Sequence, residues 1–162
     1  MEYFGIDTST KAIHVVWLDS NGLPIHFYSC GSAKKNQDER FYELARSFDG
    51  LVFSKDDFGA VEKPLFVQSA PATIGLAQVV GAVKLSLFNK HIEFSPVGNT
   101  TWKKIVVGKG NVKKEQIKQF TIEKFKMQEN LVQDFYDACC ISYWAYIFRN
   151  SIGYAKENNA IK

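Results

Sequence analysis

The sequence predicts an α/β fold in which a five-stranded mixed sheet is flanked by helices. The first observation behind this prediction is the order of the segments: three strand-like runs come first, and helical and strand-like runs then alternate. The second is that 162 residues with 46% hydrophobic composition contain no proline-, glycine- or serine-rich linker, which indicates one core. We expect a single domain over residues 1–149, followed by a polar C-terminal tail over residues 150–162.

The three N-terminal strands form an antiparallel meander. Residues 2–7 are predicted as the first strand, and small polar residues suited to a turn follow it. Residues 13–18 and 24–28 are the next two strands, and Asn21-Gly22 between them is a strong hairpin signal.

The later elements alternate, and a strand that follows a helix is expected to add to the meander in parallel. The helix over residues 69–89 is rich in small residues, which permits close packing against a neighbouring element. The expected elements are a helix over residues 34–48, a strand over 58–62, a helix over 69–89, a strand over 91–94, a short helix over 99–106, a basic helix over 112–125 and a helix over 133–149.

Four acidic residues stand where charge is unexpected. Asp7 and Glu62 end the first and fourth strands, and Asp134 and Asp137 begin an apolar helix, three residues apart and so on one face. Clustered carboxylates repel one another unless a cation lies between them, and hard oxygen ligands suit Mg²⁺ or Mn²⁺. The sequence therefore predicts an acidic, metal-binding pocket whose chemistry is hydrolysis at phosphate.

Each acid also has a structural interpretation when it is taken alone. Asp134 could cap the last helix, with Asp137 favoured by the helix dipole. Asp7 could form a turn at the end of its strand, and Glu62 could pair with Lys63 at the surface. The occurrence of all four together favours a functional site.

The net charge of +3 hides an asymmetry along the chain. Residues 1–80 carry 7 basic and 10 acidic side chains, whereas residues 81–162 carry 13 and 7. A basic stripe beside an acidic metal pocket suits a phosphodiester backbone, and Gly108 and Gly110 would let the chain approach a phosphate. The alternative is a solvated basic face. The stripe comprises Lys103, Lys104, Lys109, Lys113, Lys114 and Lys118.

No segment of the sequence is typical of a membrane protein or a zinc site. The longest apolar stretch, over residues 138–148, is shorter than the roughly 20 residues that span a bilayer, and the N-terminus lacks the pattern of a secretory signal. We therefore expect a cytoplasmic protein with no membrane partner. His14, His26 and His91 lack the spacing of zinc ligands.

The order of elements, with acids after the first and fourth strands and on the last helix, resembles the RNase H-like superfamily. Within it, residues 102–117 and the later Asp-Phe-Tyr-Asp-Ala are similar to the RuvC-type Holliday-junction resolvases, which carry a VxGxGxAxKxQV block and a D-x-x-D-A helix. The similarity extends from Phe4 to about Ala145. The turn Thr8-Ser9-Thr10 departs from the family's Pro-Gly, and the last helix carries bulkier residues, which suggests a divergent, viral or phage branch acting in a host cytoplasm.

The resemblance implies roles for these residues. The four acids would be the catalytic tetrad that holds two Mg²⁺ ions, with Mn²⁺ as a substitute, and Lys114 would stabilise charge on the phosphate as a further catalytic residue. The six lysines of the stripe would bind DNA. Phe66, in the loop after the second acid, would wedge into the junction centre.

The implied activity is cleavage of four-way (Holliday) DNA junctions by paired, symmetric phosphodiester hydrolysis in a homodimer, with the helix over residues 69–89 as the candidate dimer face.

Three alternatives stay open. One is a broader nuclease for flaps and forks, and another is a junction-binding protein without cleavage activity. The third is an ATP-binding domain like those of the actin and sugar-kinase superfamily, suggested by residues 5–10; those proteins clamp ATP between two such domains, which counts against it here.

Overall fold

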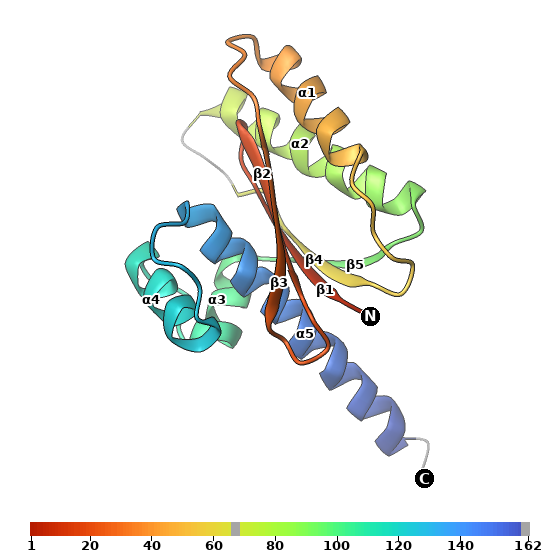
Figure 1. Ribbon diagram of the computed structural model, residues 1–162. Helices are drawn as coiled ribbons and strands as arrows, with labels where there is room; N and C mark the ends of the chain where they lie inside the picture. Colours follow the sequence, from red (N-terminus) through yellow and green to blue (C-terminus); the bar gives the residue numbers. More distant parts are fainter. Residues whose placement is uncertain (66–68, 160–162) are drawn as a thin grey trace.

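The computed structural model describes residues 1–65 and 69–159, with the side chains of the last helix up to residue 152. A five-stranded sheet lies between two layers of helices (Figure 1). The strands are β1 (Tyr3–Thr8), β2 (Ala12–Leu18), β3 (Pro24–Gly31), β4 (Phe58–Glu62) and β5 (Glu93–Val97). The helices are α1 (Gln37–Asp49), α2 (Ala70–Asn89), α3 (Asn99–Val107), α4 (Lys114–Phe125) and α5 (Gln133–Asn159).

The strand order is β3-β2-β1-β4-β5. Strands β1 and β2 pair antiparallel, as do β2 and β3, whereas β4 adds in parallel to β1 and β5 adds in parallel to β4. The predicted mixed sheet, with a meander followed by parallel additions, is confirmed. Because β1 and β4 run in the same direction, their carboxyl ends meet at one edge of the sheet.

Several element boundaries differ from the expected ones. Helix α1 begins at Gln37 because the side chain of Asn36 caps it, accepting hydrogen bonds from the amides of Asp38 and Glu39. Strand β5 starts later than expected and includes Pro96, which is tolerated because β5 is an edge strand. Helix α5 does not end near residue 149 but continues through Asn159, so residues 150–159 belong to this helix.

The alternation of side chains along each strand gives the sheet two cores. Phe4 and Ile6 of β1 face the layer formed by α1 and α2. Tyr3, two residues before Gly5 and four before Asp7, faces the layer that contains α5. Because successive side chains of a strand point to opposite faces, Asp7 lies on the α5 face of the sheet.

Helix α5 packs against β1 at unusually short distance. A Cβ atom placed on Gly5 would lie 2.1 Å from the amide nitrogen of Ser142 and 2.3 Å from the carbonyl oxygen of Ala138. The Ser142 hydroxyl donates a hydrogen bond of 2.8 Å to the carbonyl oxygen of Tyr3. Since α5 lies directly on β1, its first turn is held beside the carboxyl end of that strand.

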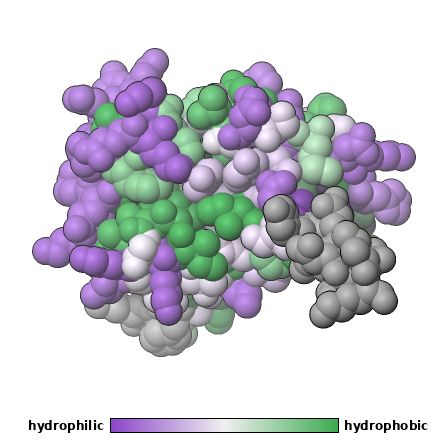
Figure 2. Space-filling model, turned by 90° about the horizontal axis from the view of Figure 1, so that it is seen from below, coloured by the Kyte–Doolittle hydropathy of each residue, from purple (hydrophilic) through white to green (hydrophobic). Residues whose placement is uncertain are grey.

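Helix α2 is apolar on its exposed face as well as on the face that packs in the core. By length and composition it could cross a membrane, and its mean hydropathy is 1.4. In the fold, 33% of that stretch is buried. Val79, Val83 and Leu87 pack in the core, while Leu85 and Phe88 are 59% and 72% exposed. The stretch over residues 138–148 is therefore not the longest apolar segment. The end of the molecule opposite α1 and α2, seen from below, shows a separate apolar area bordered by hydrophilic side chains (Figure 2).

Candidate active site

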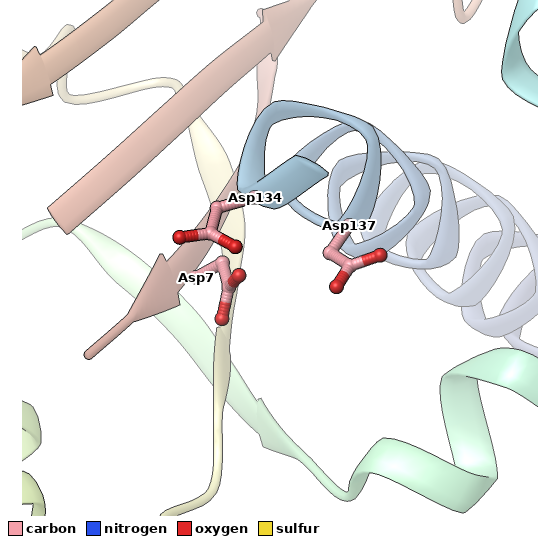
Figure 3. A group of neighbouring side chains, drawn as sticks. All are labelled: Asp7, Asp134 and Asp137. Carbon is pink, nitrogen blue, oxygen red and sulfur yellow. The ribbon is translucent and has the colours of Figure 1, made fainter. Parts of the chain in front are cut away.

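Three of the four predicted acids gather at one point. Asp7 lies near the end of β1, Asp134 lies on the first turn of α5, and Asp137 lies at the start of its second turn (Figure 3). One carboxylate oxygen from each of the three lies within 4.8 Å of the other two. The structure thus brings together acids from the two ends of the domain.

Glu62 lies next to this cluster, at the end of the neighbouring strand. The register pairs Ile6 with Val61, so Asp7 and Glu62 follow side by side on the α5 face. The pKa of Asp7 is raised well above its usual value by burial, then by the negative charges of Glu62, Asp137 and Asp134. A hydrogen bond between the carboxyl groups of Asp7 and Glu62 acts in the same direction.

Two side chains of α3 fix the carboxylate of Glu62. Its Oε1 atom accepts hydrogen bonds of 2.7 Å from Asn99 Nδ2 and 2.8 Å from Trp102 Nε1. Trp102 is fully buried, so this donor is held rigidly. Asn99 and Trp102 were not among the predicted site residues, because their contact with Glu62 depends on the position of α3, which follows β5 and packs against α5.

The environment of Asp137 is mixed. Burial raises the pKa of Asp137 to about 6. A hydrogen bond from Gln133 and the positive charge of Lys103 act in the opposite direction, because both favour the ionised form. The Gln133 amide lies 3.1 Å from Asp137 Oδ1 and 3.4 Å from the carbonyl oxygen of Lys114. Gln133 therefore connects the start of α4 to the acid cluster.

His14 also belongs to this site, although the sequence pattern raised it only as a poor zinc ligand. It is buried and lies directly across from Asp7 in the β1–β2 pair. Its Nδ1 atom lies 3.6 Å from Asp134 Oδ2, and its ring contacts that of Phe135 edge to face. Burial lowers the pKa of His14, and the negative charge of Asp134 opposes that effect.

The loop before α5 is anchored by Tyr136. The buried hydroxyl of Tyr136 donates a 2.8 Å hydrogen bond to the carbonyl oxygen of Gln128 and accepts one of 3.2 Å from the amide of Leu131. These bonds fix the point at which α5 begins. They therefore fix the positions of Asp134 and Asp137, which lie close to Tyr136 at the start of α5.

The structure divides the predicted basic stripe. Lys103 lies close enough to the cluster for its charge to act on Asp137, and Lys114 begins α4 next to Gln133. The amine of Lys118 lies over the ring of Tyr136, 5.9 Å from its centroid. These three lysines therefore lie on the side of the cluster formed by α3 and α4.

The rest of the stripe lies farther along the same segment. Lys104 lines a shallow depression with Thr100 and Thr101, whereas Lys109 and Lys113 lie exposed between α3 and α4. Gly108 ends α3 in the left-handed conformation, with φ of 92°, so the helix end accounts for this glycine. Phe66, the predicted wedge, lies outside the described residues.

The donor set of this cluster fits a hard divalent cation. All three clustered ligand groups are carboxylates, and their oxygens are close enough together to share one ion. The raised pKa values of Asp7 and Asp137 reflect burial together with the mutual repulsion of these charges. Mg²⁺ or Mn²⁺ would remove that repulsion, and the residues present therefore fit the predicted metal.

Comparison with known proteins gives a consistent result. Residues 8–143 match the family described as crossover junction endodeoxyribonuclease RuvC. The protein of that name from a Nitratiruptor species is 28% identical over 128 residues, which cover 76% of this chain and 80% of the relative. The one from Shewanella putrefaciens is 24% identical over 153 residues, which cover 91% and 88%.

Solved structures share the whole architecture. The structure of Thermus thermophilus RuvC matches with a TM-score of 0.75 at 18% identity, covering 93% of this chain and 97% of that one. T. thermophilus RuvC in complex with Holliday junction substrate matches with a TM-score of 0.76 at 15% identity, covering 92% and 96%. With a family match over most of its length and the predicted fold, the chain belongs to the RuvC family of crossover junction endodeoxyribonucleases.

Proposed function

We propose that this chain is a metal-dependent, structure-specific endonuclease that cleaves four-way DNA junctions by paired, symmetric phosphodiester hydrolysis. The observation that carries the proposal is the cluster of Asp7, Asp134 and Asp137 oxygens within 4.8 Å of one another, in a domain of the RuvC family. Lys103 and the start of α4 lie beside this cluster. Carboxylates for metal ions and lysines for phosphates therefore occupy one site.

The four acids would hold two Mg²⁺ ions, and Mn²⁺ would substitute for them. The chemistry that such ions supply is activation of water for in-line attack and neutralisation of charge on the leaving 3′ oxygen. Asp7 is the central acid, because its carboxyl group is close to Glu62 on one side and to the two acids of α5 on the other. Asn99 and Trp102 hold Glu62 in place, so this ligand does not have to be ordered when the substrate binds.

The lysines have two roles in this proposal. Lys103, whose charge acts on Asp137, and Lys114, whose backbone carbonyl contacts Gln133 at the start of α4, would stabilise the charge that develops on the phosphate as it is attacked. The stripe that continues along α3 and α4 binds the flanking phosphates, and it provides most of the salt-dependent affinity for DNA. A DNA substrate in turn implies a cytoplasmic location, in a host cell if the chain is viral.

Phe66 remains the proposed wedge residue. It follows Glu62 by four positions in the connection from β4 to α2, so this connection starts at the acid cluster. An apolar side chain at that place could unstack bases at the centre of a junction. Its substitution by Ala should reduce junction cleavage more than junction binding.

A homodimer is part of the proposal because symmetric cleavage of a four-stranded junction needs two sites related by a two-fold axis. The exposed face of α2 is the surface that supports it. Ile74, Leu85 and Phe88 recur on that face at helical spacing, with Gly81 between them. A second copy of this face would cover the apolar side chains, and Gly81, with nothing within 4 Å of its added Cβ position, leaves room for close approach.

The proposal can be tested with a panel of DNA substrates. The purified protein and its Asp7→Asn variant are incubated with an immobile four-way junction, a flap and a linear duplex, with Mg²⁺, Mn²⁺ or chelator. Metal-dependent paired nicks confined to the junction, and absent from the variant, are the expected result. Nicks on the flap as well would indicate a broader nuclease, and junction binding without any cleavage would indicate an architectural protein.

A further inference from the structure

We infer that His14 is a positioning residue for the acid cluster, which holds the carboxylate of Asp134 so that one oxygen remains directed toward Asp7 and Asp137. The inference rests on the proposed metal-dependent function. It assigns a role to a strand residue outside the four acids and the lysine stripe. Three features of His14 support it: its place in the sheet, the surroundings of its ring and its distance from the acids.

The position of His14 in the sheet is one that an apolar residue would normally occupy. On the same face of β2, the next two positions are Val16 and Leu18, which are fully buried in the core against α5. His14 is also buried, with 6% of its surface exposed. A buried polar ring loses hydration, so its place in this core needs a compensating interaction.

That interaction is provided by the start of α5. His14 lies opposite Asp7 in the antiparallel register, so both side chains are on the same face of the sheet. Its Nδ1 atom faces Asp134 Oδ2 at 3.6 Å. The ring of Phe135 lies edge to face with the imidazole, with centroids 4.9 Å apart, and Phe135 also packs against Phe27 of β3. The imidazole is therefore held between the sheet and the first turn of α5.

The distances favour a positioning role over direct metal binding. The donor atoms that gather within 4.8 Å of one another in the described residues belong to Asp7, Asp134 and Asp137, and the imidazole is not among them. At 3.6 Å the contact with Asp134 is longer than a hydrogen bond but short enough for an electrostatic contact between the ring and the carboxylate. Carboxylates that bind metal ions are commonly held by hydrogen-bond donors of the surrounding protein, and His14 Nδ1 is the ring atom that lies beside the Asp134 carboxylate.

The test compares the Mn²⁺ affinity of the parent protein with that of three variants, all without DNA. The affinity is measured from the electron paramagnetic resonance signal of free Mn²⁺. His14→Phe keeps a ring but removes the donor, and it should weaken Mn²⁺ binding by roughly 10- to 100-fold. His14→Asn carries an amide nitrogen at the position of Nδ1 and should recover most of the affinity. His26→Phe, on β3 at the other end of the sheet, is the matched control and should bind Mn²⁺ like the parent.

The outcomes separate this inference from the proposed function. If the parent protein binds Mn²⁺ and His14→Phe, correctly folded, binds it equally well, His14 is only a core residue and the inference is wrong. If the parent itself binds no Mn²⁺, the proposed metal-dependent function fails. Equal losses of affinity in His14→Phe and His14→Asn would also contradict the inference, because a donor at the Nδ1 position would then have no effect.

A second measurement uses the parent protein alone, so it does not depend on whether a variant folds. The ¹⁵N resonances of the His14 imidazole in the parent protein report which ring nitrogen carries the proton. We expect a protonated Nδ1 whose resonance shifts when Mg²⁺ is added, since Asp134 would then bind the ion. A neutral ring protonated only at Nε2 could not donate to Asp134 and would overturn the inference.

Discussion

The backbones of Gly5 and Ser142 lie in direct contact, so close that a Cβ atom on Gly5 would be 2.1 Å from the Ser142 amide nitrogen. This contact lies two residues from Asp7 on the strand and eight residues from Asp134 on the helix. It determines the distance between β1 and α5. The acid cluster therefore exists because the strand has no side chain at this position.

Gly5→Ala should consequently disturb both the fold and the site. The added methyl group meets backbone atoms that cannot rotate away, so α5 must move from β1, at a cost of about 1–3 kcal/mol or more in the free energy of unfolding. Denaturant unfolding measures that cost, and Mn²⁺ affinity reports the separation of Asp7 from the α5 acids. Gly50→Ala is the control, because its added Cβ would meet only ordinary contacts of 3.5 Å or more. A Gly5→Ala protein with parental stability and metal affinity would show that this contact does not position the site.

Asp137→Asn should stabilise the protein in the presence of chelator at pH 8. The pKa of Asp137 is about 6 in the folded protein, above its value in the unfolded chain, so ionisation above that pH destabilises the fold. The gain should be roughly 1–2 kcal/mol at pH 8 and should largely vanish below about pH 4, where the carboxyl group is protonated in both states. Asp7→Asn should act in the same direction. Denaturant unfolding across this pH range tests the sign, and a variant less stable than the parent at pH 8 would contradict it.

Metal binding should strengthen as the pH rises. A carboxylic acid must lose its proton to bind a cation, and Asp137 with a pKa of about 6 is mostly protonated at pH 5 and mostly ionised at pH 7. Mn²⁺ affinity should therefore increase about tenfold or more between these pH values, with further protons released from Asp7. Calorimetric titration in buffers of different ionisation enthalpy counts the protons. An affinity that is constant from pH 5 to pH 7 would remove both acids from the metal site.

Replacing Lys103 and Lys114 together with Ala should weaken DNA binding and reduce its dependence on salt. Each phosphate contact adds about 0.9 to the slope of log affinity against log salt concentration, so the double variant should lose roughly 2 from that slope. Lys55→Ala is the control, because Lys55 lies before the start of β4, at the opposite end of the sheet from Asp7. An unchanged slope in the double variant would place the DNA elsewhere on the surface.

Leu85→Glu should convert the proposed dimer into monomers. Leu85 is 59% exposed on the apolar face of α2, so a charge there costs little in the isolated fold but is buried when two copies pair. Sedimentation velocity measures the change, and junction cleavage should then give single nicks in place of paired ones. Val52→Glu, at an exposed position before β4, should leave the assembly intact. A Leu85→Glu protein that stays dimeric would assign the interface to another surface.

The sheet, and the place of each acid on its strand or helix, could be predicted because they depend on short-range patterns. The Asn21-Gly22 hairpin and the alternation of strands and helices indicated the topology, and the three-residue spacing of Asp134 and Asp137 put them on one helix face. The extent of α5 was not predictable from apolar periodicity, because the residues beyond Arg149 are mostly polar. They continue the helix all the same, and several of them, such as Ala155 and Lys156, have high helix propensity.

The residues that support the acids could not be predicted in the same way. The sequence does not give His14 the spacing of a zinc ligand, and its place beside the acids depends on its register opposite Asp7. Asn99 and Trp102 meet Glu62 only because α3 packs against α5 at the end of the sheet where β4 ends. A buried polar residue within an apolar strand, as at His14, is the signal in the sequence that could have drawn attention to this site.

The most direct test of the proposed activity uses a supercoiled plasmid that extrudes a cruciform, which is a four-way junction within closed circular DNA. A dimer that makes paired, symmetric cuts at the junction converts this plasmid to linear DNA in one binding event, whereas isolated nicks give open circles. With Mg²⁺, the parent protein should produce linear DNA cut at the cruciform, and Asp7→Asn should produce none. Equal cleavage of a plasmid without the cruciform, or no cleavage of either plasmid by the parent, would contradict the central claim.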